Sequence, residues 1–163
     1  MKHFLLFFLL IPVAALSQDC QLKKTTDEFT RETKLSTGFF PLQNASLSVD
    51  ADKKEIDFFF SLNGANKCFD NTSDIIIFYQ GTRQKNSFKN SGTMNCEGLF
   101  HFTVRNGHQT PYVLQRLSTL KVDSIKFTGN NKITTVIRPT PEQQETILQT
   151  AACVAKEAQT LLQ

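Results

Sequence analysis

The sequence predicts an α+β fold, in which a mainly antiparallel β-sheet or sandwich is packed by a C-terminal α-helix. Three observations support this prediction. Large apolar residues alternate with polar ones over residues 55–63, which is the period of a strand with one buried face. Residues 75–79 read Ile-Ile-Ile-Phe-Tyr, which is typical of a central strand covered on both faces. Apolar residues recur at helical spacing from 141 to about 162, and a helix with such a stripe should cover one face of the sheet.

Strand-forming segments fill the first two thirds of the chain. Residues 27–37 alternate charged and hydroxyl side chains, which suits an exposed edge strand. The Phe-Phe-Pro-Leu segment at 39–42 predicts a loop against the core. Turn-forming residues at 50–53 separate two strands, 45–50 and 54–63, which should form a hairpin. Further strands are expected at 74–80, 84–89 and 98–105.

Two Thr-Pro pairs predict the starts of helices. Thr110 is expected to cap a short helix at 111–120, because proline is well tolerated at the first helical position. The second pair, Thr140-Pro141, is followed by Gln143 in the spacing of a capping box. Between the two helices, residues 122–129 and 132–138 predict a hairpin over a Gly-Asn-Asn turn.

Residues 1–17 have the three parts of a secretory signal peptide. Lys2 is followed by an apolar run at 4–13 and by small residues that place the cleavage after Ser17. The run is shorter than the ~20 residues that a transmembrane helix needs. We therefore expect a secreted or periplasmic protein whose mature chain, 18–163, is a single domain without a transmembrane segment. Lipidation of Cys20 is disfavoured, because Gln-Asp precedes it in place of small residues.

Charge and composition exclude some functions. The formal net charge is only +3 and the basic residues are scattered, whereas nucleic-acid binding needs a basic stripe or patch. The fifteen phenylalanines supply bulk for a hydrophobic core. A small apolar ligand or a protein is therefore a more reasonable partner than a nucleic acid.

The four cysteines predict two disulfide bonds. An even number in an exported chain favours bridges, and four cysteines allow three pairings. We favour Cys68–Cys96, which would close a loop within one sheet, and Cys20–Cys153, which would join the termini. No C-x-x-C spacing supports a zinc site. Because Cys153 falls almost opposite the apolar stripe of its helix, either the N-terminal segment crosses the outer surface of the helix or the helix bends near that residue.

Several short motifs resemble those of a loose group of small, uncharacterised secreted proteins of Gram-negative bacteria. These motifs are an early cysteine before Asp-Glu-Phe-Thr at 27–30, Lys-Cys-Phe-Asp at 67–70, Asn-Cys before Gly98, and a cysteine in the terminal helix. The resemblance covers most of the mature chain and implies the four-cysteine framework and the strand order. It implies no activity. This chain departs from the group in the second hairpin, where it has Lys-Phe-Thr-Gly at 126–129.

No group of residues in the sequence points to catalysis, a cofactor or a resident metal. His101 and His108 lack a metal-ligand partner at helical or strand spacing, and G-x-S-x-G is absent. Asp70 and Asp74 could gather oxygens for calcium, but their segment lacks the twelve-residue loop pattern, and an Asx-rich turn is the simpler interpretation.

The favoured function is therefore a non-enzymatic structural or binding module. A first alternative is a carrier that holds a small apolar ligand in a cavity between sheet and helix. Its candidate lining residues are Phe58, Phe60, Phe78 and Phe102. A second alternative, a small hydrolase, requires that folding bring a histidine within hydrogen-bond reach of a serine or carboxylate in a cleft.

Overall fold

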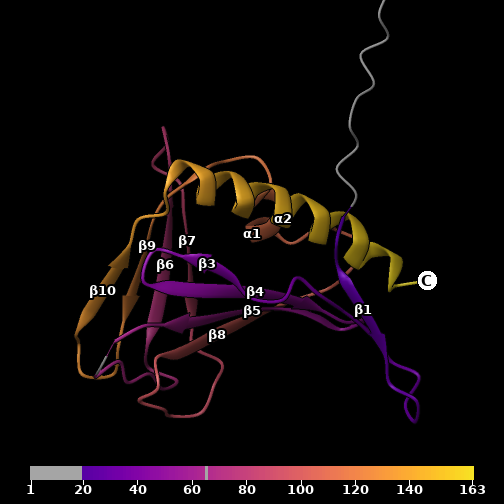
Figure 1. The fold of residues 1–163 in the computed structure, drawn as a ribbon, viewed down its shortest axis with the longest axis horizontal. Helices are drawn as coiled ribbons and strands as arrows, with labels where there is room; N and C mark the ends of the chain where they lie inside the picture. Colours follow the sequence, from indigo (N-terminus) through magenta and orange to yellow (C-terminus); the bar gives the residue numbers. More distant parts are fainter. Residues whose placement is uncertain (1–19, 65) are drawn as a thin grey trace, which may run out of the picture.

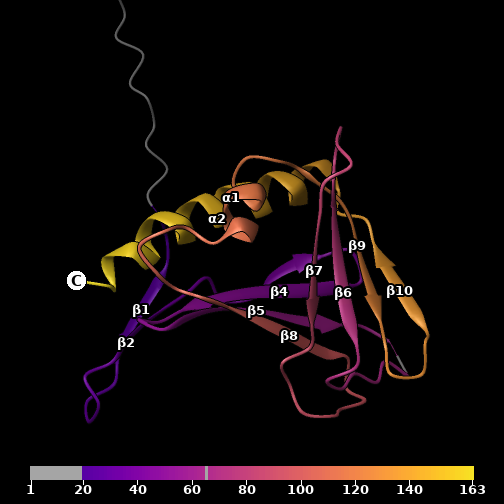
Figure 2. The same ribbon diagram turned by 180° about the vertical axis from the view of Figure 1, so that it is seen from behind.

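Two antiparallel β-sheets and two helices make up residues 20–64 and 66–163, the part of the chain that the computed structural model describes. The six-stranded sheet has the order β1-β2-β4-β5-β8, with β3 also paired to β4, and the four-stranded sheet has the order β10-β9-β6-β7. The strands of the smaller sheet run crosswise to those of the larger one, at one end of it (Figures 1 and 2). The elements are β1 Lys23–Thr26, β2 Thr33–Ser36, β3 Phe40–Leu42, β4 Ala45–Ala51, β5 Glu55–Leu62, β6 Asp74–Tyr79, β7 Lys85–Lys89, β8 Leu99–Arg105, α1 Tyr112–Leu117, β9 Val122–Thr128, β10 Thr134–Ile137 and α2 Pro141–Thr160.

The chain passes back and forth between the two sheets. It leaves the larger sheet after β5, forms the β6–β7 hairpin in the smaller sheet, and returns to the larger sheet as β8. After α1 it crosses again to the β9–β10 hairpin. The predicted α+β fold is confirmed, and so are the hairpins predicted at 45–63 and 122–138.

The core lies where the inward faces of both sheets meet. Alternate residues of β5 are fully buried, as the period of two predicts, and the residues between them are half-buried or exposed. The aromatic ring of Phe60 on β5 lies 5.2 Å, between ring centroids, from that of Phe127 on β9. Phe100 on β8 lies 5.4 Å from the same Phe127 ring. These edge-on contacts join the two sheets into one hydrophobic cluster.

Helix α2 packs its apolar stripe against this core and lies on the same side of the molecule as α1 (Figure 1). Its start is the predicted capping box: Thr140 Oγ1 accepts a hydrogen bond from the Gln143 amide at 3.3 Å, and Gln143 Oε1 accepts one from the Thr140 amide at 3.0 Å. The buried residues of the helix are Gln144, Ile147, Ala151, Val154 and Ala158.

Three local predictions were wrong. Residues 27–37 are not one edge strand, because Asp27 Oδ1 accepts the amides of Phe29 and Thr30 and turns the chain between β1 and β2. The segment at 39–42 is not a loop, since 40–42 form β3 and pair with β4. Thr110 does not cap α1: the N-cap is Pro111, and no side chain caps that helix.

The predicted signal peptide at 1–17 lies outside the described residues. Among the described residues, no helix is long and apolar enough to cross a membrane.

Candidate functional site

A concave site lies beside α2, and we call it the disulfide groove. It has a volume of about 800 Å³. One wall is the helix, through residues such as Thr146, Gln149 and Thr150. The opposite wall is the N-terminal segment from Cys20 to Leu22, which the Cys20–Cys153 disulfide attaches to the helix. Thr37 and Phe40, which come just before and at the start of β3, complete the lining.

This arrangement answers the question that the position of Cys153 raised. Helix α2 runs without interruption from Pro141 to Thr160, and Cys153 is half-buried rather than packed in the core. The N-terminal segment therefore reaches Cys153 from the outer side of the helix. The groove lies between this segment and the helix.

The groove has both apolar and polar lining residues, and its uncharged hydrogen-bonding side chains are those of Gln21, Thr37, Thr146, Gln149 and Thr150. The Thr146 hydroxyl already donates to the carbonyl of Glu142 at 3.1 Å, and the side-chain Nε2 of Gln149 donates to Glu145 Oε1 at 3.2 Å. The side chains of Thr150 and Gln21 form no hydrogen bond to the described part of the chain, so their polar atoms are available to a ligand. One cation, Lys156, also lines the site.

Sequence reasoning missed these residues, although a signal was present. Thr146, Gln149, Thr150, Cys153 and Lys156 recur at intervals of three, one, three and three, which places them on one side of a helix. The sequence analysis considered the apolar stripe of this helix and the position of Cys153, not the other residues of its polar side. The cysteine within it was the indication that another segment of the chain lies against it.

The four phenylalanines proposed to line an apolar cavity do not surround one space. The rings of Phe58 and Phe102 stack with centroids 4.8 Å apart, and Phe60 and Phe102 lie 6.4 Å apart, all three buried. Phe88 stacks on Phe102 at 4.1 Å. Phe78 points to the opposite face of its strand from the buried Ile77. Stacked rings fill the space that a carrier would leave for its ligand.

A second polar cluster occupies the outward face of the larger sheet. His101 on β8 and Asp57 on β5 are diagonal neighbours across the strand pair, and Nδ1 of His101 lies 3.1 Å from Oδ1 of Asp57. Their side chains are 27% and 29% exposed. The ring of Phe59 lies 5.8 Å from the His101 ring, and Phe39 packs edge-on against Phe59.

Partial burial governs the electrostatics of this pair. Desolvation raises the pKa of Asp57 above its ordinary value of 3.8, against the lowering effect of His101. The other side of the imidazole, at Nε2, faces Gly92: a β-carbon there would lie 3.0 Å from Nε2. A histidine that acts as a general base in hydrolysis needs its second nitrogen directed at a nucleophile or water.

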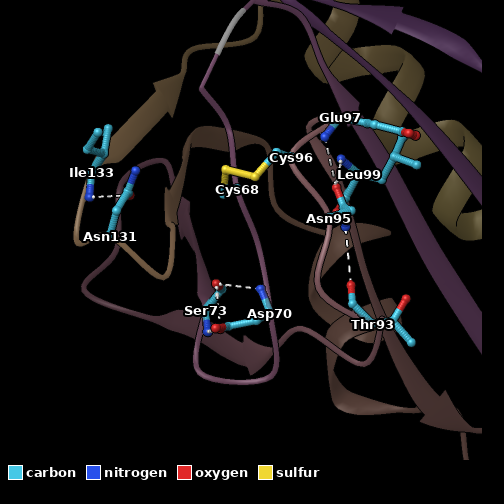
Figure 3. The surroundings of a disulfide bond; sticks show 10 residues. All are labelled: Cys68, Asp70, Ser73, Thr93, Asn95, Cys96, Glu97, Leu99, Asn131 and Ile133. Atoms are coloured by element: carbon cyan, nitrogen blue, oxygen red, sulfur yellow. Dashed lines mark hydrogen bonds between the residues drawn. A yellow bond between two sulfur atoms is a disulfide. The ribbon is translucent and has the colours of Figure 1, made fainter.

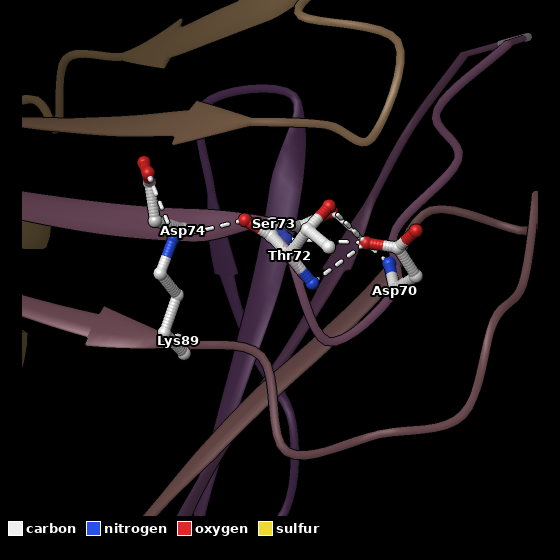
Figure 4. Close-up of polar contacts among 5 residues, drawn as sticks. All are labelled: Asp70, Thr72, Ser73, Asp74 and Lys89. Atoms are coloured by element: carbon white, nitrogen blue, oxygen red, sulfur yellow. Dashed lines mark hydrogen bonds and ion pairs between the residues drawn. The ribbon is translucent and has the colours of Figure 1, made fainter.

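The remaining sequence candidates have structural roles. His108 is exposed in the segment before α1. Asp70 Oδ1 accepts the amide and hydroxyl of Thr72, at 2.8 and 2.7 Å, and thus closes an Asx turn. Asp74 instead pairs with Lys89 at 3.5 Å (Figure 4). The two carboxylates are therefore engaged separately, and no group of three metal-ligating side chains occurs within the described residues.

Both predicted disulfides are present, and one has a different role from the one expected. Cys68 precedes β6 and Cys96 precedes β8, so the bridge joins the two segments that cross between the sheets, rather than closing a loop within one sheet (Figure 3). The crossing segments are also hydrogen-bonded, since Phe69 and Asn95 exchange backbone bonds of 2.8 and 2.9 Å. At Gly98 the chain adopts a φ of +80° and passes against the carbonyl of Leu62, where a side chain would collide.

Comparisons with known proteins add no family assignment. No protein-family model matches the chain, and neither the curated proteins nor the solved structures contain a match. The resemblance to small secreted four-cysteine proteins thus stays a prediction. The two disulfides indicate an oxidising environment, which is the usual setting for such bridges.

Proposed function

We propose that the chain is an exported, non-enzymatic binding module that holds a neutral, hydroxyl-rich ligand, such as a short saccharide, in the disulfide groove. The observation that carries this proposal is the wall of the groove. The Cys20–Cys153 bridge forms that wall and places Thr150 and Gln21 on opposite sides of one concave space. The predicted signal peptide at 1–17 and the two bridges support export.

The chemistry of the lining favours a neutral polar ligand. Hydroxyl and carboxamide groups both donate and accept hydrogen bonds, and so they match the hydroxyl groups of a sugar ring. Phe40 and Leu22 add apolar surface, against which the C–H face of a sugar can pack. The volume of about 800 Å³ lies in the range of small-ligand sites. Among the described residues that line the groove, Lys156 is the only cation that a strongly anionic ligand would meet.

The other two hypotheses find less support. A carrier of apolar ligands needs an unfilled interior, whereas Phe58, Phe102 and Phe88 are stacked at 4.8 and 4.1 Å. A hydrolase needs a nucleophile on the free side of His101, where Gly92 lies. The His101–Asp57 distance of 3.1 Å meets only the first requirement of that hypothesis.

The test is a titration of ¹⁵N-labelled mature protein with neutral oligosaccharides of the maltose and cellobiose series, followed by amide chemical shifts. We expect shifts centred on Gln149, Thr150 and Gln21. The Thr150→Leu variant should bind at least about tenfold more weakly, because it loses a hydroxyl and fills the groove. Thr160→Leu is the matched control, since Thr160 lies on α2 outside the groove and should leave binding unchanged.

A second variant connects the ligand to the bridge. Cys20→Ser combined with Cys153→Ser should abolish the saccharide-induced shifts, while the spectrum of the sheets stays dispersed because Cys68–Cys96 is retained. Shifts that map to the outward face around Phe59 and His101 would contradict the proposal. So would full binding by the bridge-less variant, or the absence of any saccharide effect.

A further inference from the structure

The edges of the two sheets differ in how they are protected from pairing with another strand. β1 carries Lys23 and Lys24, which is a common way of discouraging strand addition. On β7, Lys85 and Lys89 do the same, and Arg116 Nη1 covers the Lys85 carbonyl at 2.9 Å. On β8, the backbone of His101 is bonded by the segment that follows β7. Its amide donates to Asn90 Oδ1 at 3.0 Å, and its carbonyl accepts from Ser91 N at 2.8 Å.

β10 lacks these devices. Its four residues, Thr-Thr-Val-Ile, are all β-branched and uncharged, which is the composition with the highest strand propensity. The strand ends the smaller sheet and lies at the outer margin of the molecule in both views (Figures 1 and 2). Val136 is 44% exposed, and Ile133, which precedes the strand, is 56% exposed. An edge of this kind favours the addition of another strand.

The register shows which backbone groups face outward. Gly129 N donates to the carbonyl of Ile133 at 2.9 Å, so Ile133 belongs to a hydrogen-bonded pair of the β9–β10 ladder. Hydrogen-bonded and non-hydrogen-bonded pairs alternate along antiparallel strands. The amide and carbonyl groups of Thr134 and Val136 therefore point away from β9, and within the described residues no other element bonds to them.

A small pocket lies beneath this edge, and we call it the edge pocket. It measures about 200 Å³ and is lined by Ile133 and Thr135, together with Phe69 and the segment around Lys67. Lys67 Nζ donates to Thr135 Oγ1 at 3.0 Å and is half-buried. No carboxylate lies within ion-pair distance of Lys67 in the described part of the chain.

The surroundings of β10 are positively charged. Lys126 is the residue directly opposite Val136 on β9, and Lys132 and Arg138 flank the strand on either side. Like Lys67, these three cations form no ion pair with a described residue. A second copy of the chain would bring the same cations together, which is unfavourable. A segment with acidic side chains would complement them.

We propose that β10 accepts an extended, acidic segment of a partner protein as a fifth strand of the smaller sheet, with one carboxylate side chain of that segment in the edge pocket. The outward groups of Thr134 and Val136 supply the backbone bonds, and Lys67 supplies the counter-charge. Strand addition of this kind obtains affinity from the backbone and specificity from pockets that take alternate side chains. The site lies apart from the disulfide groove and does not depend on the function proposed for it.

The probe is a synthetic peptide of alternating threonine and valine with a central glutamate, acetylated and amidated at its ends, titrated into ¹⁵N-labelled protein. We expect the amides of Thr134 and Val136 to shift and to gain at least about tenfold protection from hydrogen exchange, since they become bonded. A peptide of the same side chains with N-methylated backbone should not bind. A peptide with lysine in place of glutamate should bind at least about tenfold more weakly.

Two variants separate the backbone from the charge. Val136→Pro removes one outward amide at an edge position that tolerates proline and should abolish binding, whereas Val136→Thr keeps the amide and should retain it. Lys67→Gln should remove the preference for glutamate without changing the protection pattern. Equal binding of the N-methylated or lysine peptide would overturn the proposal, and so would the absence of binding. A concentration-dependent dimer that Val136→Pro abolishes would overturn it as well, by assigning the edge to a second copy.

Discussion

At the scale of single residues, Asp57 and Asp70 have pKa values shifted in opposite directions. The Thr72 hydroxyl and amide donate to the Asp70 carboxylate, stabilise its charged form, and lower its pKa below the ordinary 3.8. Desolvation on the outward sheet face raises the pKa of Asp57, despite the nearby His101. The two groups should therefore make the stability of the fold depend on pH with opposite signs.

The sign follows from which state binds the proton more tightly. The carboxylate of Asp70 binds a proton more tightly in the unfolded chain than in the native state. Asp70 therefore contributes stability above pH 3.8, and this stability is lost as the pH falls through the lowered pKa. The carboxylate of Asp57 binds a proton more tightly in the native state. The stability that its protonated form contributes is lost as the pH rises from 3.8 through the raised pKa. The difference in stability between each variant and the unchanged protein should thus depend on pH. Asp70→Asn should be less stable, relative to the unchanged protein, at neutral pH than at acidic pH, and Asp57→Asn should be more stable. Urea denaturation between pH 3 and 7 measures both, and equal pH profiles for the two variants would contradict the assignment.

At the scale of secondary-structure elements, the two threonines that precede helix-starting prolines provide a direct comparison. Thr140 accepts the Gln143 amide and completes a capping box, whereas the Thr110 side chain caps nothing in α1. Thr140→Ala should lower the free energy of unfolding by about 0.5–2 kcal/mol. Thr110→Ala should change it by less than about 0.5 kcal/mol. Chemical denaturation of both variants checks this, and a larger effect at Thr110 would contradict the assignment of the cap to Thr140.

The same comparison shows what the sequence could predict about the elements. Long segments with a clear period, such as β5 and α2, were placed within a few residues, because burial of one face imposes the period. β3 was missed because it has only three residues, one of them proline, and because its strand conformation depends on pairing with β4. The β1–β2 hairpin was missed because its turn depends on hydrogen bonds from two amides to Asp27, which the composition of the segment does not distinguish from a charged strand.

Sites assembled from distant segments were less accessible to sequence reasoning. Alternation placed Asp57 and His101 on outward faces, but only the pairing of β5 with β8 brings them to 3.1 Å. Alternation also cannot assign a strand to one of two sheets. The Cys68–Cys96 pair was therefore predicted correctly while its position between the sheets was not. The disulfide groove depends on a segment of three residues, Cys20 to Leu22, that has no periodicity to interpret.

At the scale of the whole molecule, the two disulfides restrict the unfolded chain to different extents. Cys20 and Cys153 are 133 residues apart, and Cys68 and Cys96 are 28 apart. In the chain-entropy treatment, closing loops of these lengths stabilises the native state by about 5 and about 3–4 kcal/mol, respectively. Paired serine substitutions of Cys20 and Cys153 should therefore cost more free energy of unfolding than those of Cys68 and Cys96. Guanidinium denaturation of both double variants measures the difference.

The structure also indicates how the shorter bridge could contribute more to stability than the longer one. The shorter bridge joins both segments that cross between the sheets, next to the Phe69–Asn95 backbone pair and the tight passage at Gly98. If its removal allowed the two sheets to separate, the variant lacking Cys68 and Cys96 would lose more stability than the entropy of a 28-residue loop explains. It would also show a reduced denaturant dependence, since the sheets would no longer unfold together. A cost that follows loop length, with unchanged denaturant dependence in both variants, would instead show that core packing across Phe60 and Phe127 suffices to hold the sheets together.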